Sequence, residues 1–330
     1  MDLATQGIAG AALAQAFAPA RHSRRAAGVG LLAGLLPDAD ALIHSASDPL
    51  LQLEYHRHFS HALISIPVGA ALVALLLYFF FRKHLSFKQL YIFSLCGYGT
   101  GGLIDACTSY GTHLLWPFSS NPVAWNIIAI VDPVFTLALA LPLFVGLRQR
   151  RPIRTGIVLA CAYLLFGWVQ HQRAEVVAYD LAATRKHQPS QLIVKPTIGN
   201  QLLWRSIYIA NDSVYVDAVR VGNEPRIYHG QSTKLFDLDR DLAWAGPAAR
   251  ARRDAERFSR FAHGLLALSP STPHFLGDIR YAMLPTSIEP LWGIQLDPTK
   301  PQTPALYQTQ RSLAPALRDS FMTMLLGRNF

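Results

Sequence analysis

Long apolar runs, separated by short basic clusters, fill the first half of the chain. The clearest run covers residues 61–81, and about 20 apolar residues are enough for a helix to cross a bilayer. Other apolar segments lie at 3–20, 26–36, 90–107, 123–147 and 155–169. This pattern predicts an α-helical membrane bundle of about four to six helices within residues 1–170.

The remaining residues, 171–330, show a different pattern. Residues 202–210 and 213–219 are rich in β-branched and aromatic side chains, and the turn-forming pair Asn211 and Asp212 separates them, which predicts a β-hairpin. An amphipathic helix, two further strands and a closing helix are expected at 246–265, 274–284, 290–296 and 311–326. We therefore expect a smaller α+β extramembrane domain after the bundle.

The basic clusters predict an orientation in the membrane. They lie at 21–25, 82–88 and 148–154. Because Lys and Arg are enriched in cytoplasmic loops, we place these clusters in the cytoplasm. The opposite side then carries residues 38–61, 106–122 and the whole α+β domain.

Composition is typical of a membrane protein and argues against a nucleic-acid-binding protein and a cysteine-stabilised protein. Half of the residues, 51%, are hydrophobic and only 15% are charged. The net charge of +9 could suit nucleic acid, but the basic residues flank apolar runs, so we expect the bilayer and not nucleic acid as the partner. The three cysteines lie in apolar segments at unrelated spacings, which argues against a disulfide framework or a cysteine zinc site.

Aspartate and histidine residues gather between positions 35 and 61. Ionisable side chains are costly near a bilayer, so such a cluster indicates a functional site. Carboxylates mixed with imidazoles are typical of Zn²⁺, Mn²⁺ or Fe²⁺ sites. Asp38 and Asp40 are two residues apart, so both can bind one metal only if residues 37–40 form a loop or a helix end. His56 precedes a helix that we expect to start at His61 with Ser60 as its N-cap.

The helical rise of about 1.5 Å per residue places other polar residues at a similar depth. Counted from the cytoplasmic helix ends, five residues lie ~20 to ~31 Å into a hydrocarbon core of about 30 Å. They are Gln6, Asp38, His61, Asp105 and Asp132. We therefore expect a site at the outer end of the bundle.

Simpler roles stay open for several of these residues. Asp38 and Asp40 could cap the second helix among lipid headgroups. Asp132 precedes Pro133, so it could only end a helix and bond the freed backbone. Solvated or interfacial loop positions are expected for His44, Asp48, His58, His113 and Trp116.

Four motifs, in this order among the apolar spans, carry a family resemblance. They are PDAD at 37–40, HRHFSH at 56–61, DACTSYGTHLLWPF at 105–118 and IVDPVFTLAL at 130–139. The chain resembles the YbcI/YdjM-like inner-membrane metal-dependent hydrolases of bacteria up to about residue 147, and NQLLWRSIY and DIRYAM resemble the outer domain of longer members.

The resemblance implies a membrane-bound hydrolase of the bacterial inner membrane, and with the basic clusters we expect a multi-pass protein with a periplasmic C-terminal domain. The resemblance also implies metal-binding roles for Asp38, Asp40, His56, His61 and Asp105, and assigns Arg57 and Asp132 to the same motifs. Two positions depart from the family pattern, because Gln6 stands where some members have histidine and Gly101 stands where many do. The departures imply a more carboxylate-rich centre, or one metal where relatives hold two.

The leading hypothesis is a metal-dependent hydrolase with Arg57 and Asp132 as catalytic residues. Zinc is the expected metal, with manganese or iron as alternatives. The expected substrate is a phosphoester or ester of a lipid or lipid-linked molecule. A non-catalytic protein with a structural metal site and a partner-binding outer domain is the alternative. A transporter fits less well, because we find no pair of inverted repeats.

Overall fold

The computed structural model describes residues 1–146, 150–311 and 314–329, and these residues form two compact units. The helical unit contains Met1–Ile43, Tyr55–Val169 and Ile198–Asn200, and the sheet unit contains His44–Glu54, Gln170–Thr197 and Gln201–Phe330. The sequence analysis placed residues 44–54 in the helical part, whereas they cluster with the sheet unit.

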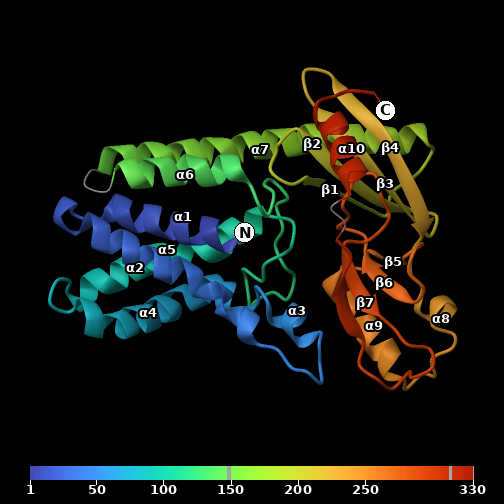
Figure 1. Ribbon diagram of the computed structural model, residues 1–330, viewed down its shortest axis with the longest axis horizontal. Coiled ribbons are helices and arrows are strands. Elements are labelled where there is room, and N and C mark those ends of the chain that lie inside the picture. The colour runs from blue at the N-terminus through green and yellow to red at the C-terminus, as the bar shows by residue number, and fades with distance from the viewer. Residues whose placement is uncertain (147–149, 312–313, 330) are drawn as a thin grey trace. The chain divides into compact units, whose positions relative to one another are not determined.

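Six helices build most of the helical unit (Figure 1). They are α1 (Leu3–Phe17), α2 (Ser23–Leu35), α4 (Ile66–Phe81), α5 (Phe87–Cys107), α6 (Pro133–Val145) and the first part of α7 (Arg150–Thr184). Helices α1, α2 and α5 all pack against one another. This expected helical N-terminal region is confirmed.

Glycines allow these three helices to approach closely. A Cβ atom on Gly30 of α2 would lie 2.3 Å from the carbonyl oxygen of Gly10 in α1, and one on Gly97 of α5 would lie 2.4 Å from the carbonyl oxygen of Gly30. Small residues at helix contacts are typical of membrane proteins, because close backbone approach replaces the missing hydrophobic driving force.

Fewer segments qualify as membrane spans by length and composition than the sequence analysis expected. In the described part of the chain, two segments are long and apolar enough to cross a membrane, Leu63–Phe81 and Arg151–Thr184, and α6 is apolar but shorter. Helices α1 and α2 contain 15 and 13 residues, which at about 1.5 Å per residue fall short of a hydrocarbon core of about 30 Å. The expected bundle of four to six membrane helices is therefore not confirmed.

Two expected segments extend beyond the described residues. Residues 147–149 end the apolar segment 123–147 and begin the basic cluster 148–154, and residues 312–313 belong to the expected closing helix. The described part of that closing helix is α10 (Pro315–Leu325).

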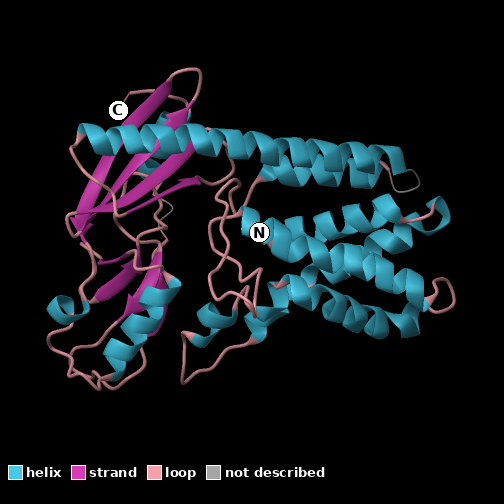
Figure 2. Ribbon diagram, turned by 180° about the vertical axis from the view of Figure 1, so that it is seen from behind, coloured by secondary structure: helices cyan, strands magenta, loops and turns pink. Residues whose placement is uncertain are grey.

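The sheet unit holds two antiparallel four-stranded sheets (Figure 2), so its expected α+β character is confirmed. In both, the strands follow one another in chain order. The first contains β1 (Gln191–Pro196), β2 (Leu203–Ala210), β3 (Ser213–Val221) and β4 (Pro225–Lys234). The second contains β5 (Leu266–Leu268), β6 (Phe275–Asp278), β7 (Trp292–Gln295) and β8 (Leu306–Thr309). Helices of this unit include α3 (Leu51–Tyr55), α8 (Leu238–Asp241), α9 (Arg250–Phe261) and α10.

The predicted hairpin is present as β2 and β3. Ala210 pairs with Ser213, and the two residues between them, Asn211 and Asp212, have φ angles of 50° and 54°. Both central residues of a two-residue type I′ turn need positive φ, which Asn and Asp tolerate better than most residues. Trp204 and Val219 of this hairpin pack with Ala174 and Ala178 of α7.

Candidate metal centre

Three segments of the helical unit position four of the five candidate ligands. A 3-10 helix, Pro37–Leu42, follows α2 and carries Asp38 and Asp40. Because this segment is not a regular α-helix, both carboxylates reach the same cluster of side chains, as the sequence analysis required. A second short turn, Phe59–His61, carries His61, and Asp105 lies in the last turn of α5.

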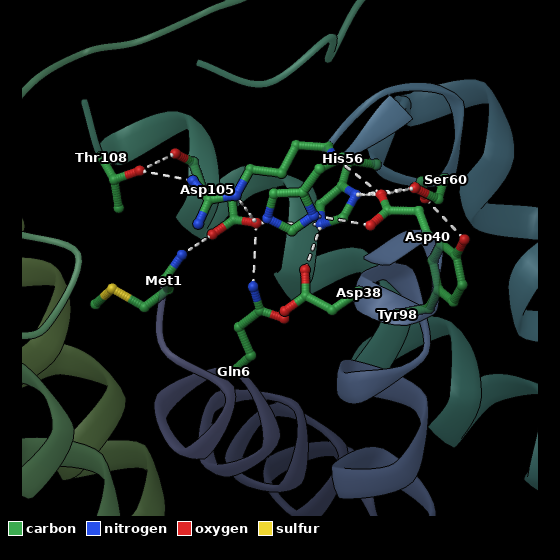
Figure 3. Close-up of polar contacts among 11 residues, drawn as sticks. Met1, Gln6, Asp38, Asp40, His56, Ser60, Tyr98, Asp105 and Thr108 are labelled. Atoms are coloured by element: carbon green, nitrogen blue, oxygen red, sulfur yellow. Dashed lines mark hydrogen bonds and ion pairs between the residues drawn. The ribbon is translucent and has the colours of Figure 1, made fainter. Parts of the chain in front are cut away.

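His61 lies at the centre of the cluster with both ring nitrogens facing carboxylates. Its Nε2 is 3.1 Å from Asp38 Oδ1 and 3.1 Å from Asp105 Oδ2, and its Nδ1 is 3.2 Å from Asp40 Oδ2. The side chains of His61 and Asp105 are fully buried. Figure 3 shows Asp38 and Asp105 converging from different segments.

Asp40 is hydrogen-bonded to several residues of the segment 56–60 (Figure 3). Its Oδ1 is 2.9 Å from His56 Nδ1, and its Oδ2 accepts hydrogen bonds from the Arg57 backbone N–H at 2.9 Å and the Ser60 hydroxyl at 2.5 Å. Burial alone would raise the pKa of the Asp40 carboxyl, but hydrogen bonds with His56, His61 and Ser60 outweigh it and hold this pKa well below the usual range. Asp40 therefore stays ionised and orients both histidines.

The donor set fits a divalent cation. Two groups of side chains offer ligand atoms that lie within 4.8 Å of one another: Asp38 with His61 and Asp105, and Asp38 with Asp40 and His56. Asp38 belongs to both groups. Nitrogen and carboxylate donors together are those that zinc, manganese and iron prefer.

Gln6 adds an independent sign that the cluster suits a cation. Its Nε2 donates a hydrogen bond to Asp105 Oδ2 at 3.0 Å, but its buried Oε1 has no hydrogen-bond partner among the described residues. A buried oxygen acceptor without a donor is costly, and a cation beside it would remove that cost. Figure 3 shows Gln6 extending from α1 towards Asp38 and Asp105.

Burial alone lowers the pKa of His61, but hydrogen bonds to Asp105, Asp38 and Asp40 outweigh it and raise the pKa to about 10. Without a cation, His61 is therefore protonated at neutral pH. A metal ion at Nε2 would take the place of this proton between the same carboxylates.

The model of the YdjM inner membrane protein family matches residues 1–174, more than half of the chain. The chain belongs to this family. Membership supports membrane association and an inner membrane location, and the matched range contains all the candidate ligands. Searches of curated proteins and of solved structures found no match.

Arg57, which the family motif includes, lies inside the cluster. It is 4% exposed, and its backbone adopts a φ of 59°, which is uncommon for a residue with a side chain. Its Nε is 3.3 Å from Asp105 Oδ2, and its Nη1 donates a hydrogen bond to the Thr108 hydroxyl at 3.0 Å. Uncommon backbone conformations persist only where the surroundings hold them, and they are frequent at functional sites.

Asp132 is the one predicted site residue that the structure does not bring to this cluster. Its Oδ1 accepts hydrogen bonds from the backbone N–H groups of Val134 and Phe135, so it caps α6, and its Oδ2 accepts one from the Tyr163 hydroxyl at 2.9 Å. These contacts match the capping role that the sequence left open.

Sequence reasoning missed Ser60 as part of the site. It predicted Ser60 as the N-cap of a helix from residue 61, but α4 begins at Ile66, after two short 3-10 turns. The Ser60 hydroxyl instead contacts Asp40 and His61 Nδ1. The Ser-His pair in HRHFSH was the available signal, because it places a hydroxyl next to a candidate ligand. The Met1 ammonium, which also contacts Asp105, lacked any signal of this kind, whereas Gln6, whose Nε2 donates to Asp105, had been grouped with it by depth.

Proposed function

We propose that this family member is a membrane-bound metal-dependent hydrolase that cleaves a phosphoester or ester of a lipid or lipid-linked molecule. The observation that carries the proposal is the arrangement around His61, whose Nε2 faces Asp38 and Asp105 while its Nδ1 faces Asp40. Hydrogen bonding of the second nitrogen to a carboxylate is how proteins orient a metal-binding histidine.

The proposed ligands divide into two sets. Asp38, His61 and Asp105 form the more buried set, and Asp38, Asp40 and His56 form the set that is nearer to solvent. One metal would use the first set, with Asp40 fixing the His61 tautomer. Two metals would share Asp38. Zinc is the proposed metal, because it accepts imidazole and carboxylate at one centre.

A bound divalent metal would lower the pKa of a water molecule from about 15.7 towards 7, which supplies a nucleophile at neutral pH. The protein would contribute charge and orientation. Arg57 would hold an anionic group of the substrate, since a guanidinium pairs well with phosphate oxygens, and its contacts with Asp105 and Thr108 fix its position. Asp40 would keep His56 and His61 in place.

The substrate class follows from the proposed location. Inner membrane membership and two apolar segments that could cross the membrane favour a substrate anchored in the bilayer. The positive-inside pattern favours the outer face, with the sheet unit in the periplasm.

The test is hydrolysis by the purified, zinc-loaded protein of phosphoesters and carboxylesters presented in mixed micelles. We expect turnover by the wild type and a loss of about 10²-fold or more in Asp38→Ala and Arg57→Ala. His58→Ala is the matched control, because His58 lies in the same motif but in neither ligand group among the described residues. Equal turnover in all four proteins would exclude this mechanism.

Burial of the cluster favours one alternative, a structural metal site. The side chains of Asp40, His61 and Asp105 are fully buried, whereas a catalytic metal must keep a position open for water. X-ray absorption of the zinc-loaded protein distinguishes the two. Four protein ligands without a water oxygen, together with no turnover, would favour the structural role.

A further inference from the structure

The chain segment that joins the two halves of the candidate site belongs to the other unit. Asp40 and His56 both lie in the helical unit, whereas His44–Glu54, between them, cluster with the sheet unit. The chain leaves the helical unit after Ile43 and returns at Tyr55. This excursion, residues 44–54, ends two residues before His56.

A buried leucine holds the middle of the excursion. Leu50 is 2% exposed and belongs to the same apolar core as Phe258 of α9 and Leu276 of β6. Leu53 packs against that core as well. The excursion is therefore a built part of the sheet unit and not a loose surface loop.

Arg257 of α9 forms hydrogen bonds with two acidic residues of the excursion, Asp48 and Glu54. Arg257 donates from Nε and Nη2 to the two carboxylate oxygens of Glu54, both at 2.8 Å. It also donates from Nη1 and Nη2 to the two oxygens of Asp48, at 2.9 and 3.0 Å. Paired hydrogen bonds between a guanidinium and a carboxylate fix direction as well as distance, and here one guanidinium fixes two carboxylates.

Glu54 lies in α3, and His56 is the first residue after this helix. Helix α3 contains only five residues, too few for a helix to be stable by itself in water. Its order must come from contacts such as those of Glu54 with Arg257 and of Leu53 with the core. Loss of these contacts would release the chain directly before a candidate ligand.

We propose that Arg257 is a positioning residue for the metal centre. By fixing Asp48 and Glu54 it holds α3, and thereby sets His56 at its 2.9 Å distance from Asp40. The sheet unit thus acts on metal binding in the helical unit through the chain itself. This inference rests on the proposed metal site.

The test compares Zn²⁺ affinity of the full-length detergent-solubilised wild type, Arg257→Gln and Arg253→Gln, by competition with a chromogenic chelator. Loss of a group that orients a metal ligand typically weakens binding by about 10–100-fold. We expect about tenfold weaker binding in Arg257→Gln and wild-type affinity in Arg253→Gln. Arg253 is an exposed residue of the same helix that makes no hydrogen bond or ion pair with the excursion among the described residues. Arg257→Lys, which keeps the charge without the planar fork, should be intermediate.

A second readout separates positioning from a purely structural role. Backbone hydrogen exchange over residues 51–61 in the metal-free protein should rise in Arg257→Gln and not in Arg253→Gln. Lower thermal stability with unchanged Zn²⁺ affinity and unchanged exchange in this region would overturn the inference. Should Arg257→Gln fail to fold, Glu54→Gln must show the same weakening of Zn²⁺ binding, or the inference is wrong.

Failure of this inference can be told apart from failure of the proposed function. A wild-type protein that binds no Zn²⁺ would refute the metal site and this inference with it. A wild type that binds Zn²⁺ with the same affinity as Arg257→Gln would refute the positioning role alone.

Discussion

Single side chains decide which atoms of the cluster are available to a cation. Asp40 faces Nδ1 of His61, so this nitrogen keeps its proton when the imidazole is neutral, and Nε2 is left to face Asp38 and Asp105. The same carboxylate contacts His56. One aspartate therefore orients both histidines of the proposed site.

The raised pKa of His61 predicts how metal binding depends on pH. The pKa of His61 rises from 6.5 to about 10 in the metal-free fold. Protonation of His61 therefore stabilises that fold, fully below pH 6.5, and this stabilisation is lost as the pH rises through 10. A cation must displace this proton, so Zn²⁺ affinity should increase by about tenfold per pH unit. Chelator competition at pH 6.5 and 7.5 measures this, and equal affinities would contradict the assignment of His61 as a ligand.

Gln6→His would add an imidazole next to a candidate ligand, because Gln6 Nε2 lies 3.0 Å from Asp105 Oδ2. Gln6 Oε1 has no hydrogen-bond partner among the described residues, and an imidazole at this position would add a nitrogen donor to the more buried ligand set. We expect Zn²⁺ affinity to rise by about tenfold or more, measured by the same competition. Unchanged affinity in a folded variant would place Gln6 outside the site.

Close packing between elements brings His61 to Asp105. A Cβ atom on Gly102 of α5 would lie 2.3 Å from the carbonyl oxygen of His61, so only glycine lets the Phe59–His61 turn rest against this helix. Gly102 precedes Asp105 by about one helical turn. The backbone contact therefore sets the distance between two candidate ligands.

Gly102→Ala should separate the turn from α5. Overpacking of this kind costs about 1–3 kcal/mol, and here it also displaces His61, so we expect lower thermal stability and weaker Zn²⁺ binding. Gly99→Ala is the control on the same helix, because its Cβ would be 3.7 Å from Ile66 Cγ2, an ordinary contact. Equal Zn²⁺ affinity in the two variants would argue against this packing role.

Local signals in the sequence predicted some elements well. Asn211 and Asp212 predicted the hairpin because the turn needs residues that tolerate positive φ. The spacing of Asp38 and Asp40 required a loop or a helix end at residues 37–40, and a 3-10 helix lies there. The start of α4 was placed too early, because the apolar pattern does not distinguish 3-10 turns from an α-helix. The contact of Arg257 with Glu54 joins residues 203 positions apart, so no local pattern could indicate it.

At the scale of the whole molecule, the depth argument grouped Gln6, Asp38, His61 and Asp105 before any contact was known, and these four residues do meet. It also included Asp132, whose carboxylate caps α6 instead. Depth gives a position along a helix but not the direction in which a side chain points. Depth can therefore group residues at one level without showing which of them meet.

The proposed periplasmic location of the sheet unit predicts the behaviour of a fusion. A phosphatase reporter placed after Phe330 should be active, because the positive-inside pattern leaves residues after about 170 outside the cytoplasm. A reporter that is active only in the cytoplasm, placed at the same site, should be silent. A silent phosphatase reporter together with an active cytoplasmic reporter would refute the orientation and the outer-face site.

The central claim is that His61 and Asp105 bind one metal centre. The most direct measurement is elemental analysis of the purified, detergent-solubilised wild type beside His61→Ala and Asp105→Ala, with His58→Ala as the control. We predict about one or two transition-metal ions per chain in the wild type and in the control, and loss of metal from both ligand variants. Absence of bound metal in the wild type after reconstitution with Zn²⁺, Mn²⁺ and Fe²⁺ would contradict the claim.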